Sequence, residues 1–138
     1  MGEISAFLRW PVGHAYDISH GYPGLLTSTD NWHVTGAGAM DIEPFRRASR
    51  DVPQERKGML ARALTARRAL WIENLADRKI NFVRRAAARK AGLKSGILLP
   101  VMAGDAPVAI LEFYTVAATA ADTAVLSALN QVAVHIGH

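Results

Sequence analysis

The sequence predicts an α+β (mixed α/β) domain in which a central antiparallel sheet carries helices on its faces. Two apolar, strand-forming segments, Ser95 to Met102 and Pro107 to Val116, are separated by Ala103-Gly104-Asp105-Ala106, which has the composition of a hairpin loop. A hairpin excludes an all-parallel sheet. Apolar residues at helical spacing occur before and after this hairpin, so we expect helices to cover the sheet.

The first part of the chain predicts two further strands. Val12 to Ile18 is rich in aromatic and β-branched residues, and Leu25 to Val34 is its expected partner across the turn residues 20–24. Residues 4–8 are expected to end a short helix, and Ile42 to Arg50 to form another.

The middle of the chain alternates helix and strand. The apolar spacing after Gly58 predicts a helix, and residues 70–72 a short strand. Asn81 is expected to cap a helix over residues 82–91. Gly92 follows directly, where a left-handed cap would end that helix.

A long amphipathic pattern predicts the last helix. Thr119 to Asp122 resembles a capping box, with aspartate in place of the usual glutamate or glutamine. Leu126 and Ala133 lie seven residues apart and suggest a second apolar face that pairs with another helix, with burial inside the domain as the equal alternative. The expected core-facing stripe comprises Ala121, Ala124, Val125, Ala128, Leu129, Val132 and Ile136.

The chain has 138 residues and no cysteine, which predicts a single domain over residues 1–138. The missing cysteines exclude a disulfide framework, thiol catalysis and cysteine-ligated zinc. No apolar run approaches the roughly 18 residues of a membrane-spanning helix, and Met1-Gly2-Glu3 lacks the basic start of a signal peptide. We therefore expect a cytoplasmic protein with no membrane span.

Charge is distributed unevenly along the chain. Fifteen of the sixteen basic residues, and only four acidic ones, lie between Arg46 and Lys94, so this segment carries about +11 and the remainder about −7. Such a field can attract anionic ligands, nucleic acid or an acidic partner domain, although solvated basic helix faces explain it more simply. A nucleic-acid-associated regulatory domain that uses residues 46–94 is the alternative function. Against it, the segment lacks a helix-turn-helix signature and has no aromatic residues apart from Trp71 and Phe82.

No residue pattern identifies an enzyme or a metal site. Gly36-Ala37-Gly38 lacks the third glycine of a dinucleotide-binding loop. His14 and His20, with Asp17 between them, could hold a metal but are more often polar groups at strand ends and turns. The serines lie in no setting typical of an activated nucleophile; they include Ser28, Ser49, Ser95 and Ser127.

Several segments, in order and spacing, resemble the GAF sensory domain. They are WPVGHAY from Trp10, Asn31-Trp32-His33, GMLARALTARRALWIENL from Gly58, and NFVRRAAARKAGLKSGILLPVMAGDAPVAILEFY from Asn81. Together they look like the bacterial type found in sensor histidine kinases and cyclic-di-GMP signalling proteins, over roughly residues 8–138. Two departures stand out. Gly58-Met59-Leu60-Ala61-Arg62 replaces a glycine-leucine-proline-glycine-arginine motif, and the N-terminal helix looks truncated, as in an excerpt of a larger protein.

The resemblance implies an antiparallel sheet of five or six strands, with helices on one face and a ligand pocket on the other, closed by the helices after Gly58 and Asn81. We expect the final helix to lie on the sheet as well, so that both faces carry helices. Plain core packing of the aromatic residues is the alternative to a pocket. The residues that match the pocket, or are expected to contribute charge to it, are Trp10, His14, Trp32, Phe45, Arg62, Trp71, Phe82, Ser95 and Glu112.

The resemblance also implies a non-enzymatic signal-input module. It would bind an unknown small molecule, or form a homodimer through its terminal helices, and regulate a linked output domain of the histidine kinase or diguanylate cyclase type. Relatives that bind bilin covalently, and the methionine sulfoxide reductases of this fold, use cysteines that this chain lacks. We therefore expect neither a covalent cofactor nor thiol-dependent reductase activity.

Glu112 is expected to carry a buried charge. Strand alternation places it on one face with Ile110 and Tyr114, between two mostly apolar surfaces, where a carboxylate needs a partner. We expect Arg62 to supply that partner as a bidentate guanidinium. The equal alternative is that Glu112 lies near a sheet edge and reaches water.

Overall fold

The computed structural model describes residues 9–18, 26–35, 41–50 and 58–136. Their centre is a five-stranded sheet in the order β2-β1-β5-β4-β3, in which every neighbouring pair is antiparallel. This confirms the predicted α+β class. The strands are β1 (Val12–Ile18), β2 (Leu26–Val34), β3 (Leu70–Ile72), β4 (Ser95–Ala103) and β5 (Ala106–Thr115).

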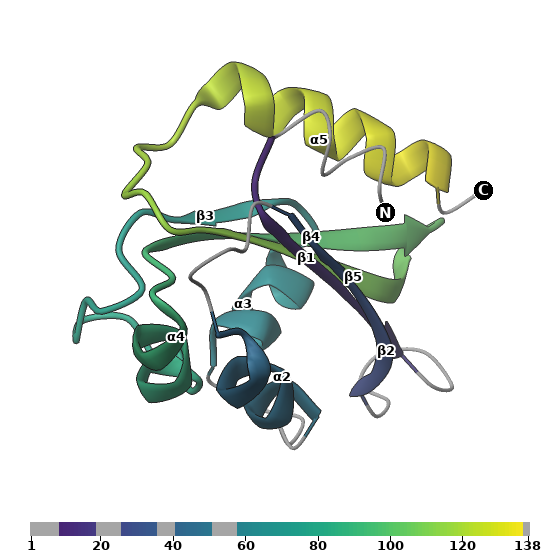
Figure 1. The fold of residues 1–138 in the computed structure, drawn as a ribbon. Coiled ribbons are helices and arrows are strands. Elements are labelled where there is room, and N and C mark those ends of the chain that lie inside the picture. Colours follow the sequence, from purple (N-terminus) through teal and green to yellow (C-terminus); the bar gives the residue numbers. More distant parts are fainter. Residues whose placement is uncertain (1–8, 19–25, 36–40, 51–57, 137–138) are drawn as a thin grey trace.

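Helices lie on both faces of the sheet, as expected (Figure 1). Three short helices, α2 (Glu43–Arg50), α3 (Met59–Ala66) and α4 (Arg85–Ala91), share one face. The longer α5 (Thr123–Ile136) crosses the opposite face and is the only helix there among the described residues. The predicted helix over residues 4–8 and the turn over residues 20–24 lie outside the described residues.

The sheet separates two apolar cores. Ile110 and Tyr114 of β5 belong to the core under α2, α3 and α4, whereas Leu111 and Phe113 belong to the core under α5. This is the alternation that the sequence predicted for β5, and it buries the strand on both sides. Glu112, between Leu111 and Phe113, points toward the three short helices and is wholly buried.

The predicted start of α4 is wrong. The helix begins at Arg85, and Arg84 precedes it without a side-chain cap, so Asn81 does not cap it. Residues 82–84 form a turn instead, and this turn sends the side chains of Phe82 and Arg84 into the core. The predicted end is confirmed, because Gly92 has a φ of 79° and its N–H donates to the last helical carbonyls.

The cap of α5 also differs from the prediction. Asp122 is itself the capping residue, because its Oδ1 accepts the backbone N–H of Ala124 at 2.9 Å and of Val125 at 3.2 Å. Thr119, expected to begin the capping box, donates its hydroxyl to the Ala117 carbonyl at 2.8 Å. The helix therefore starts one turn later than the box predicts.

The two predicted faces of α5 are partly exchanged. Ala133, for which pairing with another helix and burial inside the domain were equal alternatives, is 3% exposed and packs on the sheet with Leu129. Val132, placed in the core stripe, is 38% exposed, and Ala121 and Ala124 of that stripe are exposed as well. The observed core face is therefore rotated from the predicted stripe, toward Ala133. No helix among the described residues is long and apolar enough to cross a membrane.

Candidate functional site

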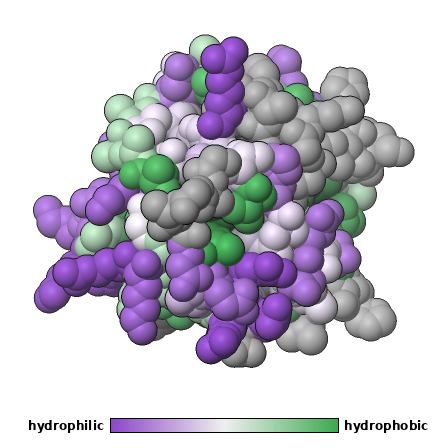
Figure 2. Space-filling view, viewed as in Figure 1, coloured by the Kyte–Doolittle hydropathy of each residue, from purple (hydrophilic) through white to green (hydrophobic). Residues whose placement is uncertain are grey.

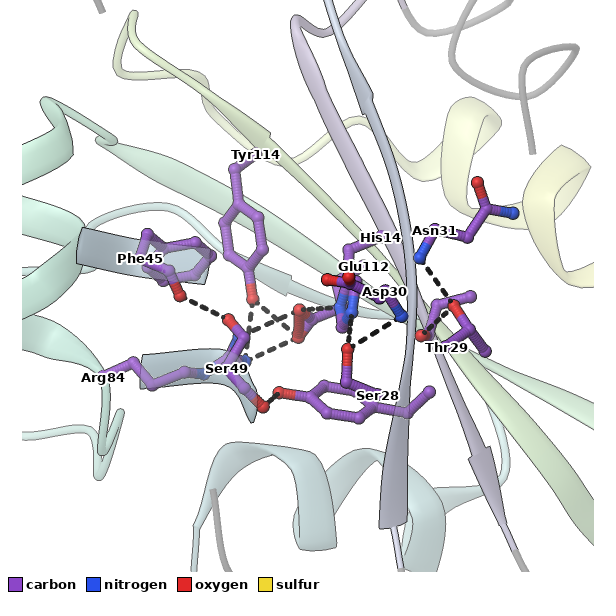
Figure 3. A network of polar contacts seen from close by, with 12 residues as sticks. His14, Ser28, Thr29, Asp30, Asn31, Phe45, Ser49, Arg84, Glu112 and Tyr114 are labelled. Carbon is purple, nitrogen blue, oxygen red and sulfur yellow. Dashed lines mark hydrogen bonds and ion pairs between the residues drawn. The ribbon is translucent and has the colours of Figure 1, made fainter. Parts of the chain in front are cut away.

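A buried ion pair joins the sheet to the helical layer. Arg84 donates from Nη1 to Oε2 of Glu112 at 2.9 Å and from Nη2 to Oε1 at 2.5 Å (Figure 3). Both side chains are at most 3% exposed. The expected buried carboxylate is thus confirmed, but the expected partner is wrong, because Arg62 lies exposed on α3.

Two further donors complete the shell of Glu112. The Tyr114 hydroxyl donates to Oε1 at 3.0 Å, and Nδ1 of His14 lies 3.1 Å from Oε2. Each carboxylate oxygen therefore has two partners, which is the condition under which a buried charge is tolerated. Arg84 also donates to Ser49 Oγ at 2.8 Å, and Ser49 in turn donates to the Phe45 carbonyl.

Strand register and helix periodicity position this cluster. His14 of β1 lies directly opposite Glu112 of β5 in the antiparallel ladder. Arg84 precedes the buried Ala88 and Ala91 by four and seven residues, so it continues the buried face of α4. We call His14, Ser28, Ser49, Arg84, Glu112 and Tyr114 the buried polar cluster.

The cluster shifts the pKa values of Glu112, Arg84 and Tyr114. Burial alone would raise the pKa of Glu112, but the Arg84 charge and the hydrogen bonds from His14 and Arg84 outweigh it and lower the pKa from 4.5 to about 2. Burial likewise opposes the charge of Arg84, yet Glu112 holds the pKa of the guanidinium well above its usual value. Burial raises the pKa of the Tyr114 hydroxyl well above its usual range. Glu112 and Arg84 therefore remain charged, and Tyr114 neutral, at neutral pH.

The protein should lose stability in acid through Glu112. Because the folded pKa is depressed, the carboxylate stabilises the fold fully above pH 4.5, and this contribution, about 3 kcal/mol, is lost as the pH falls to about 2. In urea melts at decreasing pH, the unfolding free energy of the wild type should fall more steeply across this window than that of Glu112→Gln. The wild type and Glu112→Gln share every other carboxylate. If their unfolding free energies fall in parallel with pH, the pairing is contradicted.

Ser28, His14 and Glu112 form a hydrogen-bonded chain in the order of a serine–histidine–acid triad. Nε2 of His14 lies 2.6 Å from Ser28 Oγ, while Nδ1 faces Glu112. With Nδ1 as the donor to the carboxylate, Nε2 accepts the Ser28 hydroxyl proton. No such setting was predicted for Ser28, because the three residues meet only through the pairing of β1 with β2 and β5.

The surroundings of Ser28, His14 and Glu112 do not suit these three residues for nucleophilic catalysis. Glu112 is already paired bidentately with Arg84, so it does not serve His14 alone as the acid of a triad would. His14 is fully buried, and the Trp32 ring stacks on it with centroids 4.0 Å apart. Ser28 Oγ also accepts the backbone N–H of Asp30 at 3.1 Å. These three residues are better described as part of an interior network whose hydrogen-bonding groups have partners.

Aromatic rings surround the buried polar cluster. Phe45 lies against Trp32, Phe82 and Tyr114, with ring centroids 6.1, 6.4 and 4.9 Å away. The guanidinium of Arg84 lies over the Phe45 and Phe82 rings, at 4.9 and 5.2 Å from their centroids. The structure thus brings together five of the predicted site residues: His14, Trp32, Phe45, Phe82 and Glu112.

The other predicted site residues lie elsewhere. Trp10 and Trp71 contact each other edge to face at 5.4 Å in the core under α5. Ser95 Oγ donates to the Glu73 carbonyl and accepts the N–H of Thr119, each at 2.8 Å, and so fixes the segment that leads into α5. Together with the exposed Arg62, these three residues are therefore not part of one pocket with the buried polar cluster.

Sequence reasoning missed Arg84, Ser28, Ser49 and Tyr114 as members of the cluster. For Arg84 a signal existed, since its spacing to Ala88 and Ala91 is that of one helix face. Among the described residues, no group of three histidine or acidic side chains could hold a metal ion. His20, paired with His14 in the metal hypothesis, lies outside them.

The fold and the cluster define a single-sheet α+β domain with an ionic interior between its sheet and its short helices. A model of the GAF domain matches residues 13–138, and the chain therefore belongs to the GAF family. This confirms the family to which its sequence motifs pointed. A comparison with curated proteins found no match.

Solved GAF domains share the fold across nearly the whole chain. The GAF domain of a two-component sensor histidine kinase from Bacillus halodurans has a TM-score of 0.70 at 15% identity, covering 99% of this chain and 87% of that one. A GAF domain/HD domain protein from Geobacter sulfurreducens has a TM-score of 0.69 at 12% identity, with 99% and 86% covered. GAF3 from Slr1393 of Synechocystis sp. PCC6803, in its photoproduct state, has a TM-score of 0.65 at 12% identity, with 99% and 85% covered. At these identities the likeness establishes the fold alone.

Proposed function

We propose that this GAF domain is a non-enzymatic signal-input module, which responds to a small molecule and regulates a linked output domain. The observation that carries the proposal is the buried polar cluster. It ties α2 and the start of α4 to the two central strands β1 and β5. A ligand that favours one arrangement of these contacts would shift the helical layer relative to the sheet.

The sheet offers a path from this cluster to α5. Glu112 lies in β5 between Leu111 and Phe113, and those two side chains pack under Leu129 and Ala133 of α5. A displacement of β5 at Glu112 would therefore change the surface on which α5 rests. In a longer protein, α5 is the described element that would pass this change to an output domain such as a kinase.

Unpaired donors at the edge of the cluster support a ligand site there. Trp32 Nε1 and Arg46 Nε are buried and have no hydrogen-bond partner among the described residues. Leaving a buried donor without a partner costs about 1–3 kcal/mol. The Trp32 ring stacks on His14 and lies beneath the Arg46 guanidinium, 5.9 Å from its centroid. A small molecule with a hydrogen-bond acceptor would satisfy these donors and contact the cluster directly.

Native mass spectrometry of the purified chain tests this proposal. We expect a noncovalent small molecule to be retained by the wild type and by Trp71→Phe, whose tryptophan lies in the opposite core. Trp32→Phe removes the unpaired donor and keeps an aromatic ring, although a smaller one, and should weaken retention by about fivefold or more, the worth of one hydrogen bond. A wild type that retains nothing, or equal losses in both variants, would contradict the proposal.

The proposal includes the absence of serine hydrolase activity at Ser28. An activated serine reacts with a fluorophosphonate probe, but His14 is enclosed and Glu112 is committed to Arg84, so we expect no labelling. The measurement is the intact mass of the wild type and of Ser28→Ala after incubation. Stoichiometric labelling that disappears in Ser28→Ala would show that the chain is a hydrolase.

We also propose that the domain forms a weak homodimer through the exposed side of α5. Ala124 and Val132 are exposed on this side of the helix, next to the core face. Analytical ultracentrifugation at high micromolar concentration should show a dimer for the wild type and a monomer for Val132→Glu. Gln131→Glu, an exposed neighbour with the same added charge, is the matched control. A wild type that stays monomeric would refute the interface.

A further inference from the structure

The described charged residues that line a groove beside α4 are all cations. The groove has a volume of about 1280 Å³ and lies between residues 74–83 and the segment from Arg85 to Lys94. Its charged lining residues are Arg78, Arg85, Arg89, Lys90 and Lys94. Figure 2 shows hydrophilic side chains gathered over the lower left of the molecule, where Figure 1 places α4, with apolar patches between them.

No acidic side chain of the described residues lines this groove. The two nearest acids in the sequence are engaged elsewhere, since Asp77 Oδ1 accepts the N–H of Lys79 at 2.9 Å and Glu73 Oε2 accepts the N–H of Ala121 at 2.7 Å. Arg85 also has unused capacity. Its Nε is buried without a partner, and its Nη2 reaches the Ile80 carbonyl only at 3.5 Å. None of the five groove cations forms an ion pair with an acidic side chain among the described residues.

The groove also has an apolar component. Leu75, Phe82 and Leu93, all nearly buried, contribute to its lining, and Val83 beside them is 53% exposed. Val83 is the most exposed large apolar side chain among the described residues. A ligand that matches the groove needs apolar groups as well as negative charges.

We infer that this groove binds an acidic protein segment that carries apolar side chains. The volume exceeds the roughly 300–1,000 Å³ of pockets that enclose one small ligand. Arg78, Arg89, Lys90 and Lys94 are exposed, so they are not held in a fixed phosphate-binding geometry. The one aromatic ring in the lining, Phe82, is 2% exposed and cannot stack on bases, which disfavours single-stranded nucleic acid.

This site is separate from the buried polar cluster. Arg84 and Arg85 are adjacent in the sequence, but Arg84 points to Glu112 in the interior whereas Arg85 lines the groove. At the start of α4, Arg84 thus serves the core and Arg85 is available to a partner. The inference does not depend on the presence of a small-molecule ligand.

Fluorescence anisotropy with a labelled peptide of Glu-Glu-Leu repeats tests the inference. The double variant Arg89→Gln/Lys94→Gln removes two exposed groove cations, and Arg62→Gln/Arg68→Gln removes two exposed cations outside the groove. We expect the wild type to bind the peptide, the groove variant to bind about tenfold more weakly or worse, and the control to change less than about twofold. Unchanged urea melts of both variants should confirm that they fold.

Competitors decide which class of anion the groove prefers. An all-glutamate peptide should compete less well than the Glu-Glu-Leu peptide, because it leaves the apolar lining unused. Tripolyphosphate and a labelled oligothymidylate should compete or bind more weakly still. Equal losses in the groove and control variants, or tighter binding of tripolyphosphate or oligothymidylate than of the peptide, would overturn the inference.

Discussion

Replacing Arg84 by methionine is expected to lower the free energy of unfolding by about 3–5 kcal/mol, because it leaves Glu112 charged and buried without its main partner. Glu112 would keep only the hydrogen bonds from His14 and Tyr114. The two rings on which the guanidinium lies, Phe45 and Phe82, would also lose their cation contact. Apart from exchanges of Glu112 itself, no other exchange of a charged side chain among the described residues should cost as much.

Urea melts of Arg84→Met, Glu112→Gln and the double variant measure this pairing. The double variant should be much more stable than the sum of the two single losses implies, with a coupling of about 2 kcal/mol or more. Arg62→Met is the matched control, since Arg62 is exposed and should change stability by less than about 0.5 kcal/mol. Additive losses below about 1 kcal/mol would contradict the buried pair.

A single methyl group at Gly96 should also be strongly destabilising. Gly96 of β4 lies opposite Tyr114 of β5, and a Cβ there would lie 2.7 Å from Cε1 and 2.8 Å from Cδ1 of the Tyr114 ring. That ring cannot move freely, because Tyr114 is fully buried and its hydroxyl bonds to Arg84 and Glu112. We expect Gly96→Ala to cost about 1–3 kcal/mol through overpacking.

Gly96→Ala combined with substitutions of Tyr114 tests whether the Tyr114 ring causes the loss of stability. In Tyr114→Leu, which removes the ring, the added methyl group should cost much less than in the wild type. Tyr114→Phe keeps the ring and removes only the hydroxyl, so there the full cost should persist. Urea melts of the single and double variants give both differences. A cost that is the same in the leucine background would show that the ring does not exclude the methyl group.

The sequence predicted most of the fold because local rules decide it. Strand alternation placed Glu112 between two apolar faces, and Gly92 marked the end of α4 through its left-handed φ. The hairpin between β4 and β5 was likewise predicted by composition, and its Gly104 has a φ of 63°. Each of these features depends on residues close together in the chain.

The contacts of the site were harder to predict because they join distant segments. Arg62 and Arg84 are both arginines on the helical side, and only the turn over residues 82–84 decides which of them reaches Glu112. The prediction placed these residues in a helix capped by Asn81, so it did not include that turn. In α5, small alanines fit either side of the helix, so their pattern did not fix which face meets the sheet.

The measurement that tests the account most directly is hydrogen–deuterium exchange of α5 in Glu112→Gln. Neither Glu112 nor Arg84 is part of the core under α5, so a change in α5 must pass through the sheet. Leu60→Ala, a buried change in the other core, is the control for general loss of stability. At equal loss of unfolding free energy, we predict several-fold faster exchange in residues 123–136 for Glu112→Gln than for Leu60→Ala. Equal exchange in the two variants would contradict a coupling between the buried polar cluster and α5.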